Sequence, residues 1–154
     1  MELKNYLIIS IGFIFAVSLV IPVKANEADF TYPPTAIINA SYRGDEEAVR
    51  EILALGADKN VRDEFGDTAL HVAMYQKNLT IVKLLLDYGF DPNARVVKNG
   101  NTPLHNAVAA NNIGAARLLL QYGAIKNIRA LDGLTPLDRA RKSEKQEMVT
   151  LLYR

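Results

Sequence analysis

The stretch GDTALHVAMYQKNLTIVKLLLDYGFDPN (66–93) decides the fold, because a close copy, GNTPLHNAVAANNIGAARLLLQYGAIKN (100–127), follows at an offset of 34 residues. Further out on both sides, related strings open at four threonines spaced by 33, 34 and 33 residues: TAIINA (35–40), TALHVA (68–73), TPLHNA (102–107) and TPLDRA (135–140). A fixed period of this length is typical of a fold built from stacked repeats, in which each unit packs only against its neighbours.

Each unit is predicted to hold two short helices joined by a tight turn. Thr at the start is a good helix N-cap, and Pro103 and Pro136 take the first helical position, where a missing N–H costs nothing. Gly44 in one unit and Asn111 in another suit a left-handed turn between the helices. The second helix carries an apolar run and ends at a glycine such as Gly89. The segment after it is rich in Asn, Asp and Gly, and it predicts a turn or hairpin that projects outward.

These strings resemble the ankyrin repeat, whose signature is G-x-TPLH-x-A at the first helix, a leucine pair in the second helix and G-A-D-x-N at the close. The resemblance covers residues 35–154. It implies an all-α ankyrin-repeat solenoid of four helix-pair units with projecting hairpin turns, capped at both ends, with repeats at about 35–63, 64–95, 96–129 and 130–154. The tetratricopeptide repeat has a similar period, but it requires a Trp early in its first helix, and this sequence has no Trp.

An apolar segment without charged side chains, residues 6–23, precedes the repeats. Lys4 before it, Pro22 near its end and small residues up to Ala25 give the layout of a secretory signal peptide. We therefore predict a signal peptide over residues 1–25, cleaved after Ala25. An uncleaved membrane anchor is the alternative, because 18 apolar residues approach the length of a bilayer span.

Export is compatible with the rest of the chain. The sequence contains no Cys, so the protein forms no disulfides and does not depend on an oxidising compartment. Residues 26–34, which end in Pro33-Pro34, are expected to be a stiff lead-in linker. A signal peptide joined to ankyrin repeats is most natural in a bacterium with a periplasm, so the periplasm is the expected location and secretion the alternative.

The charges of the predicted mature chain are balanced in number but sorted along the sequence. Residues 26–154 hold 16 basic and 16 acidic side chains; residues 26–94 carry a net charge of −6, and residues 95–154 carry +6. This is not the uniformly basic surface of a nucleic-acid-binding protein. We expect neither nucleic acid nor, after signal cleavage, a membrane as partner. The opposite charges at the two ends allow weak head-to-tail self-association.

The sequence predicts no catalytic, cofactor or metal site. His71 and His105 occupy the same position in adjacent units, and the resemblance implies that this His bonds the backbone of the neighbouring hairpin. Asp138 takes the position in the last unit, as terminal repeats are expected to differ. The acidic cluster 45–47 begins a second helix, where carboxylates favour the helix dipole.

We therefore predict a non-catalytic protein-interaction module. The resemblance implies that a partner protein binds a concave groove made by the hairpin tips and the first helices. Tyr and Arg are the residue types that most often dominate binding energy, and Tyr42, Phe65, Tyr75 and Arg95 are the strongest candidates. An accessory subunit that stabilises an exported enzyme, or a secreted effector that binds a host protein, is the alternative. The full set of predicted partner-binding residues is Tyr42, Arg43, Arg62, Phe65, Asp67, Tyr75, Gln76, Arg95, Lys98, Asn101, Arg129 and Leu131.

Overall fold

The computed structural model describes residues 32–76 and 78–153. The predicted signal peptide, its cleavage site and most of the lead-in linker lie outside these residues. Within the described residues there are eight α-helices and no strand: α1 (Ala36–Arg43), α2 (Glu46–Ala54), α3 (Ala69–Ala73), α4 (Leu79–Tyr88), α5 (Pro103–Ala109), α6 (Ile113–Gln121), α7 (Pro136–Lys142) and α8 (Gln146–Tyr153). All of them belong to one of the two units into which the chain divides, residues 33–154.

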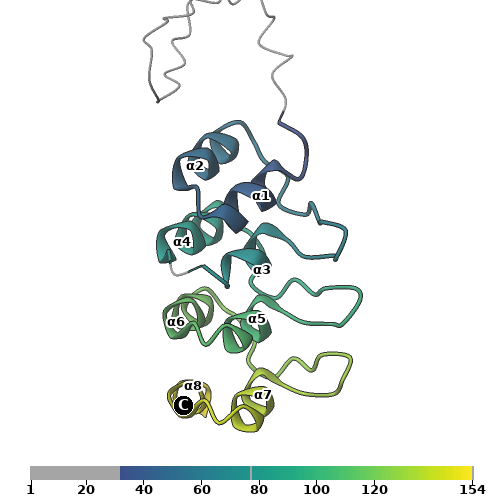
Figure 1. Ribbon diagram of the computed structural model, residues 1–154, viewed down its shortest axis with the longest axis vertical. Coiled ribbons are helices and arrows are strands. Elements are labelled where there is room, and N and C mark those ends of the chain that lie inside the picture. The colour runs from purple at the N-terminus through teal and green to yellow at the C-terminus, as the bar shows by residue number, and fades with distance from the viewer. Residues whose placement is uncertain (1–31, 77, 154) are drawn as a thin grey trace, which may run out of the picture. The chain divides into compact units, whose positions relative to one another are not determined.

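The helices are stacked in pairs (Figure 1). The first helices of the pairs, α1, α3, α5 and α7, form one layer, and the second helices, α2, α4, α6 and α8, form the other. The connections between pairs project on the side of the first helices. This arrangement confirms the predicted all-α solenoid of helix pairs. None of the helices in the described part of the chain is long and apolar enough to cross a membrane.

Polar caps begin the second helices. Asp45 at the start of α2 accepts a hydrogen bond from the Ala48 N–H at 3.1 Å, so the acidic cluster 45–47 caps a helix as predicted. Asn78 and Asn112 act in the same way for α4 and α6. The predicted left-handed turns are also confirmed, with φ 73° at Gly44 and φ 52° at Asn111.

The core lies between the two layers and continues from one pair to the next. It is filled by fully buried aliphatic side chains and by one methionine in α8: Leu70, Ile81, Leu85, Leu104, Leu119 and Met148. Burying one such side chain stabilises a fold by roughly 1.5–3 kcal/mol. Because each pair buries its side chains against the next pair, the stack and the hairpins it carries form one continuous support.

Candidate functional site

Three hairpins project from the stack, and we number them in chain order as the first (61–67), second (94–101) and third (128–134) hairpin. A backbone hydrogen bond closes each one: Asp63 N–H to Asp67 O at 3.0 Å, Val96 N–H to Asn101 O at 2.9 Å, and Ala130 N–H to Leu134 O at 3.0 Å. The second hairpin therefore spans one residue more between its closing residues than the other two. This agrees with the extra residue seen there in the sequence.

Two buried histidines hold the second and third hairpins. His71 Nε2 lies 3.3 Å from Asn101 O, and His105 Nε2 lies 3.2 Å from Leu134 O. These two oxygens are the same ones that close the hairpins. The predicted bond from each histidine to the neighbouring hairpin is therefore confirmed, and its target is the closing carbonyl.

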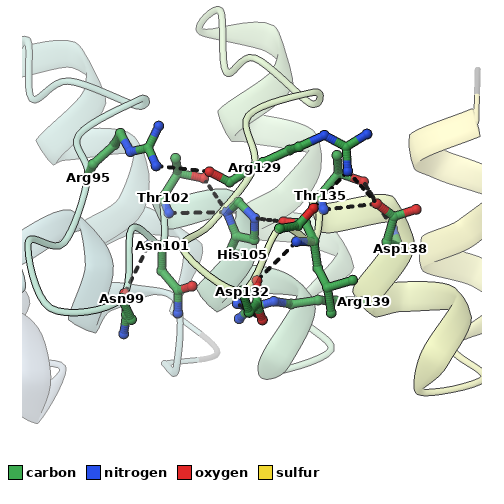
Figure 2. A network of polar contacts seen from close by, with 12 residues as sticks. Arg95, Asn99, Asn101, Thr102, His105, Arg129, Asp132, Thr135, Asp138 and Arg139 are labelled. Carbon is green, nitrogen blue, oxygen red and sulfur yellow. Dashed lines mark hydrogen bonds and ion pairs between the residues drawn. The ribbon is translucent and has the colours of Figure 1, made fainter.

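The hydrogen bonds also fix the tautomer of both rings. A carbonyl can only accept, so Nε2 must carry the proton in His71 and in His105. Nδ1 then accepts from a threonine three residues earlier: its Oγ1 lies 2.9 Å away in both units, and its N–H donates at 3.2 Å from Thr68 and 3.1 Å from Thr102. Figure 2 shows this arrangement around His105.

Burial lowers the pKa of His71 to about 4, and the bond to Asn101 O opposes this shift only in part. Burial also lowers the pKa of His105. Both rings are fully buried and both nitrogens of each ring are hydrogen-bonded. The geometry gives both histidines a structural role. Among the described residues there is also no group of three or more His, Asp or Glu side chains arranged to hold a metal ion.

Contacts from one hairpin to the next tie the three together. Lys98 Nζ donates to Glu64 O and lies 5.5 Å from the centre of the Phe65 ring. Leu131 N–H donates to Asn99 O at 2.8 Å. Four of the predicted partner-binding residues take part in such links: Lys98 and Phe65 between the first two hairpins, and Leu131 and Arg95 between the last two.

One arginine stands at the equivalent position of each hairpin. Arg62 donates to Gly66 O at 2.8 Å and Arg129 donates to Gly133 O at 2.7 Å, each within its own hairpin. In the longer second hairpin, Arg95 instead donates to Arg129 O of the third hairpin at 2.9 Å (Figure 2). All three side chains remain exposed. The sequence predicted these arginines as surface residues, but it gave no sign that Arg95 joins two hairpins.

The first helices supply the rest of this surface, which we call the hairpin face: the three hairpins together with α1, α3, α5 and α7. Tyr42 is 63% exposed and Tyr75 is 54% exposed, and Arg43 is exposed beside Tyr42. Gln76 Nε2 donates to Tyr42 O at 2.5 Å, which links the end of α3 to the end of α1. Most of the predicted partner-binding residues are thus exposed, whereas Asp67, Gln76 and Asn101 are only partly so.

Two residues of this surface were not among the predicted ones. Asn106 is buried to 4% exposure, donates to His71 O at 3.4 Å and also contacts Asp67. Arg139 donates to Asp132 at 2.8 Å. Both stand four residues after the opening threonine, a position that shares a helix face with the predicted residues further along. That spacing was the signal that could have identified them.

Partial burial affects two ionisable groups here. Burial raises the pKa of Asp67, and the neighbouring charge of Asp63 adds to the shift. Burial also raises the pKa of Tyr75, with a further contribution from Asp67. The Asp67 carboxylate and the Tyr75 hydroxyl are therefore close enough to influence each other.

Comparison with known proteins shows what this chain is similar to. A family model described as "Ankyrin repeats (3 copies)" matches residues 7–96 and 93–154. Among similar proteins, alpha-latrotoxin-Lg1a of Latrodectus geometricus is 39% identical over 74 residues, which make up 47% of this chain and 5% of the toxin. An L-asparaginase of Dirofilaria immitis is 49% identical over 53 residues, or 34% of this chain and 9% of that protein.

A putative ankyrin repeat-containing protein of Treponema pallidum (strain Nichols) is 37% identical over 71 residues, covering 46% of this chain and 23% of that protein. The chain thus matches less than a quarter of the length of each of these three relatives. Proteins with such different names share with this chain only a repeat segment, and the matched region holds no catalytic domain.

Proposed function

The chain belongs to the ankyrin-repeat family, and we propose that it is a non-catalytic module that binds another protein through its hairpin face. Ankyrin repeats are generally protein-binding modules, which supports the proposal at the level of the family. The choice of this face depends on the chain's own side chains.

The observation that carries the proposal is a row of exposed apolar side chains on the hairpins. Phe65 is 59% exposed, Val97 is 79% exposed and Leu131 is 68% exposed, one on each hairpin. Two large aromatic side chains, Tyr42 and Tyr75, are exposed on the first helices of the same face. Aromatic residues and arginines at fixed positions are the groups that most often anchor a protein partner.

The hairpins that carry this row are linked to each other and to the helix stack by the hydrogen bonds described above. Binding therefore requires little ordering of the backbone, which lowers the entropic cost of association. The stack itself does not use these side chains for its own packing. A surface of this kind supports recognition of a partner more than it supports catalysis.

A photo-crosslinking experiment tests the proposal. A photoreactive amino acid replaces Phe65 on the hairpin face or, as a matched control, the exposed Arg117 on α6 in the other helix layer. We expect a defined protein from the native cell to crosslink at position 65, and we expect Tyr75→Ala to weaken that product. Crosslinking of the same partner at position 117 with equal or greater yield would place the binding surface elsewhere and contradict the proposal.

We further propose that the chain is exported, on the strength of the apolar segment 6–23 and the small residues before Ala25. Within this proposal the partner is an exported enzyme that the chain stabilises, or a host protein that a secreted chain binds. Cell fractionation, with N-terminal sequencing of the recovered chain, separates the cases. A periplasmic pool beginning at Asn26 favours the accessory role, and recovery from the medium favours the effector. Recovery from the cytosol with an intact N-terminus would refute export.

A further inference from the structure

We infer that the second and third hairpins form a site for an acidic segment of a partner protein; this inference rests on the proposed function of the hairpin face. It names the chemistry of the partner, which the family alone does not give. The argument starts from the distribution of charge over the three hairpins.

The three hairpins differ sharply in charge. The first hairpin holds Arg62 together with three carboxylates, those of Asp63, Glu64 and Asp67. The second hairpin holds Arg95 and Lys98 and has no acidic side chain. A partner with carboxylates is therefore repelled at the first hairpin and attracted at the second.

The carboxylates near the third hairpin are already engaged. Asp132 accepts a hydrogen bond from Arg139 at 2.8 Å. Asp138 accepts bonds from the N–H and the hydroxyl of Thr135, and it lies 3.7 Å from the Arg129 guanidinium. Neither carboxylate lies within ion-pair distance of Arg95 or Lys98. The positive charge of the second hairpin is thus left to a partner.

Arg95 and Lys98 are held in place without being neutralised. Arg95 donates to Arg129 O, and Lys98 donates to Glu64 O, so both are bonded to uncharged backbone carbonyls. Most of their N–H donors remain open to solvent, because a guanidinium has five and an ammonium has three. Cations that are positioned before binding lose less conformational entropy when a carboxylate arrives.

Exposed apolar side chains stand beside these cations. Val97 lies between Arg95 and Lys98 in the second hairpin, and Leu131 follows Arg129 in the third. A partner that satisfies both kinds of group carries acidic and aliphatic or aromatic residues close together. An extended protein segment can do so, whereas a nucleic acid offers a uniform line of phosphates with no aliphatic side chain.

The spacing of the hairpins suggests how such a segment is arranged. Neighbouring helix pairs pack about 8–10 Å apart, and an extended chain rises about 3.3 Å per residue. An extended segment that runs across the hairpins therefore presents about every third residue to successive hairpins. We expect acidic residues at that interval, with apolar residues next to them.

Fluorescence anisotropy tests the inference with a defined probe, a short fluorescein-labelled peptide that has Glu at every third position with Leu beside it. The control peptide has Lys in place of each Glu. We expect the acidic peptide to bind the full chain, and the double variant Arg95→Gln/Lys98→Gln to bind it at least about tenfold more weakly, since two charge-assisted hydrogen bonds are lost. Gln keeps a donor for the backbone carbonyls, so the hairpin contacts can persist while the charge is removed. The variant Arg117→Ala removes one charge from α6 and should leave binding unchanged.

Three results would overturn the inference: equal binding of the acidic peptide to the double variant, equal binding of the lysine peptide, or binding of single-stranded oligothymidine as tight and as dependent on Arg95 and Lys98. Thermal unfolding of the double variant shows whether the fold is kept; if it is not, the single variant Lys98→Gln is used, with the same expected direction. If the acidic peptide fails while the native partner still crosslinks at position 65, the charge inference is wrong and the proposed function stands. If the partner crosslinks at position 117 instead, the proposed function itself fails.

Discussion

The first hairpin and the second hairpin have the same closing bond but different support. The closing carbonyl of the second hairpin, Asn101 O, also receives a hydrogen bond from His71 of the preceding unit. The closing carbonyl of the first hairpin, Asp67 O, receives none from the preceding unit, because the position equivalent to His71 is Ile38, a buried aliphatic residue. Instead, the Asp63 carboxylate accepts from the N–H groups of Phe65 and Asp67, both at 2.9 Å.

The difference teaches that one residue position decides how a hairpin is held. With a histidine there, the hairpin is fastened to the helix pair before it, and two units are coupled. With an aliphatic residue there, the hairpin must be held by its own side chains. Asp138 in α7 is a third case, since its carboxylate caps the helix at Thr135 as the histidine ring does but is too short to reach a carbonyl beyond it.

The largest expected effect comes from giving the second hairpin the residue found in α7. The variant His71→Asp should lose about 3–5 kcal/mol of unfolding free energy, because it places a carboxylate in a fully buried site with no cation beside it and removes the donor to Asn101 O. Urea unfolding followed by circular dichroism measures the loss. Thr35→Val serves as the matched control, since Thr35 makes no side-chain cap bond, and it should change stability little. A loss for His71→Asp as small as that of the control would mean that the ring does not fasten the hairpin.

The next effect is a loss of stability on acidification. The ordinary histidine pKa is 6.5 and that of folded His71 is about 4, so the folded state holds the ring neutral and the unfolded state binds its proton first. The resulting stabilisation is complete above about pH 6.5 and is lost as the pH falls towards about 4; at pH 5 roughly 2 kcal/mol should be gone. His105, with its pKa also lowered by burial, acts in the same direction.

Comparison with His71→Gln isolates the contribution of one ring. Gln cannot be protonated, so the variant should lose less unfolding free energy than the wild type between pH 7 and pH 5, by roughly 2 kcal/mol. The comparison matters because the raised pKa of Asp67 acts in the opposite direction at the acid end of this range. Urea midpoints of both proteins at each pH give the result. Parallel pH dependence in the two proteins would contradict the assignment to His71.

Much of this contrast could be predicted from the sequence. The four Thr-led strings predict the helix pairs, and the resemblance predicts that His71 and His105 bond a neighbouring hairpin. The sequence also shows that Ile38 and Asp138 depart from the pattern. It cannot show which carbonyl the ring reaches, because that atom belongs to a hairpin 30 residues away and its position depends on the packing of two units.

The candidate site was predictable in the same uneven way. Exposed positions such as Tyr75 and Leu131 follow from their place in the repeat. The link from Arg95 to Arg129 O does not, because it occurs only in the hairpin with the extra residue, whereas Arg62 bonds its own hairpin. Repeat position predicts which side chains face outward, and contacts between units decide which of those are held in place.

The smallest expected effect lies in the first hairpin. Asp63→Ala removes the acceptor for the N–H groups of Phe65 and Asp67, and it should cost about 1 kcal/mol, because that hairpin is exposed and the freed groups can bond water. Asp63→Asn keeps an acceptor oxygen at the same place and should cost less. Hydrogen exchange is the sharper measurement: the amides of Phe65 and Asp67 should exchange faster in Asp63→Ala, while the closing amide of the second hairpin, at Val96, keeps its protection because His71 still binds Asn101 O. If Val96 loses protection to the same extent, the two hairpins open together, and the contrast in how they are held has no energetic meaning.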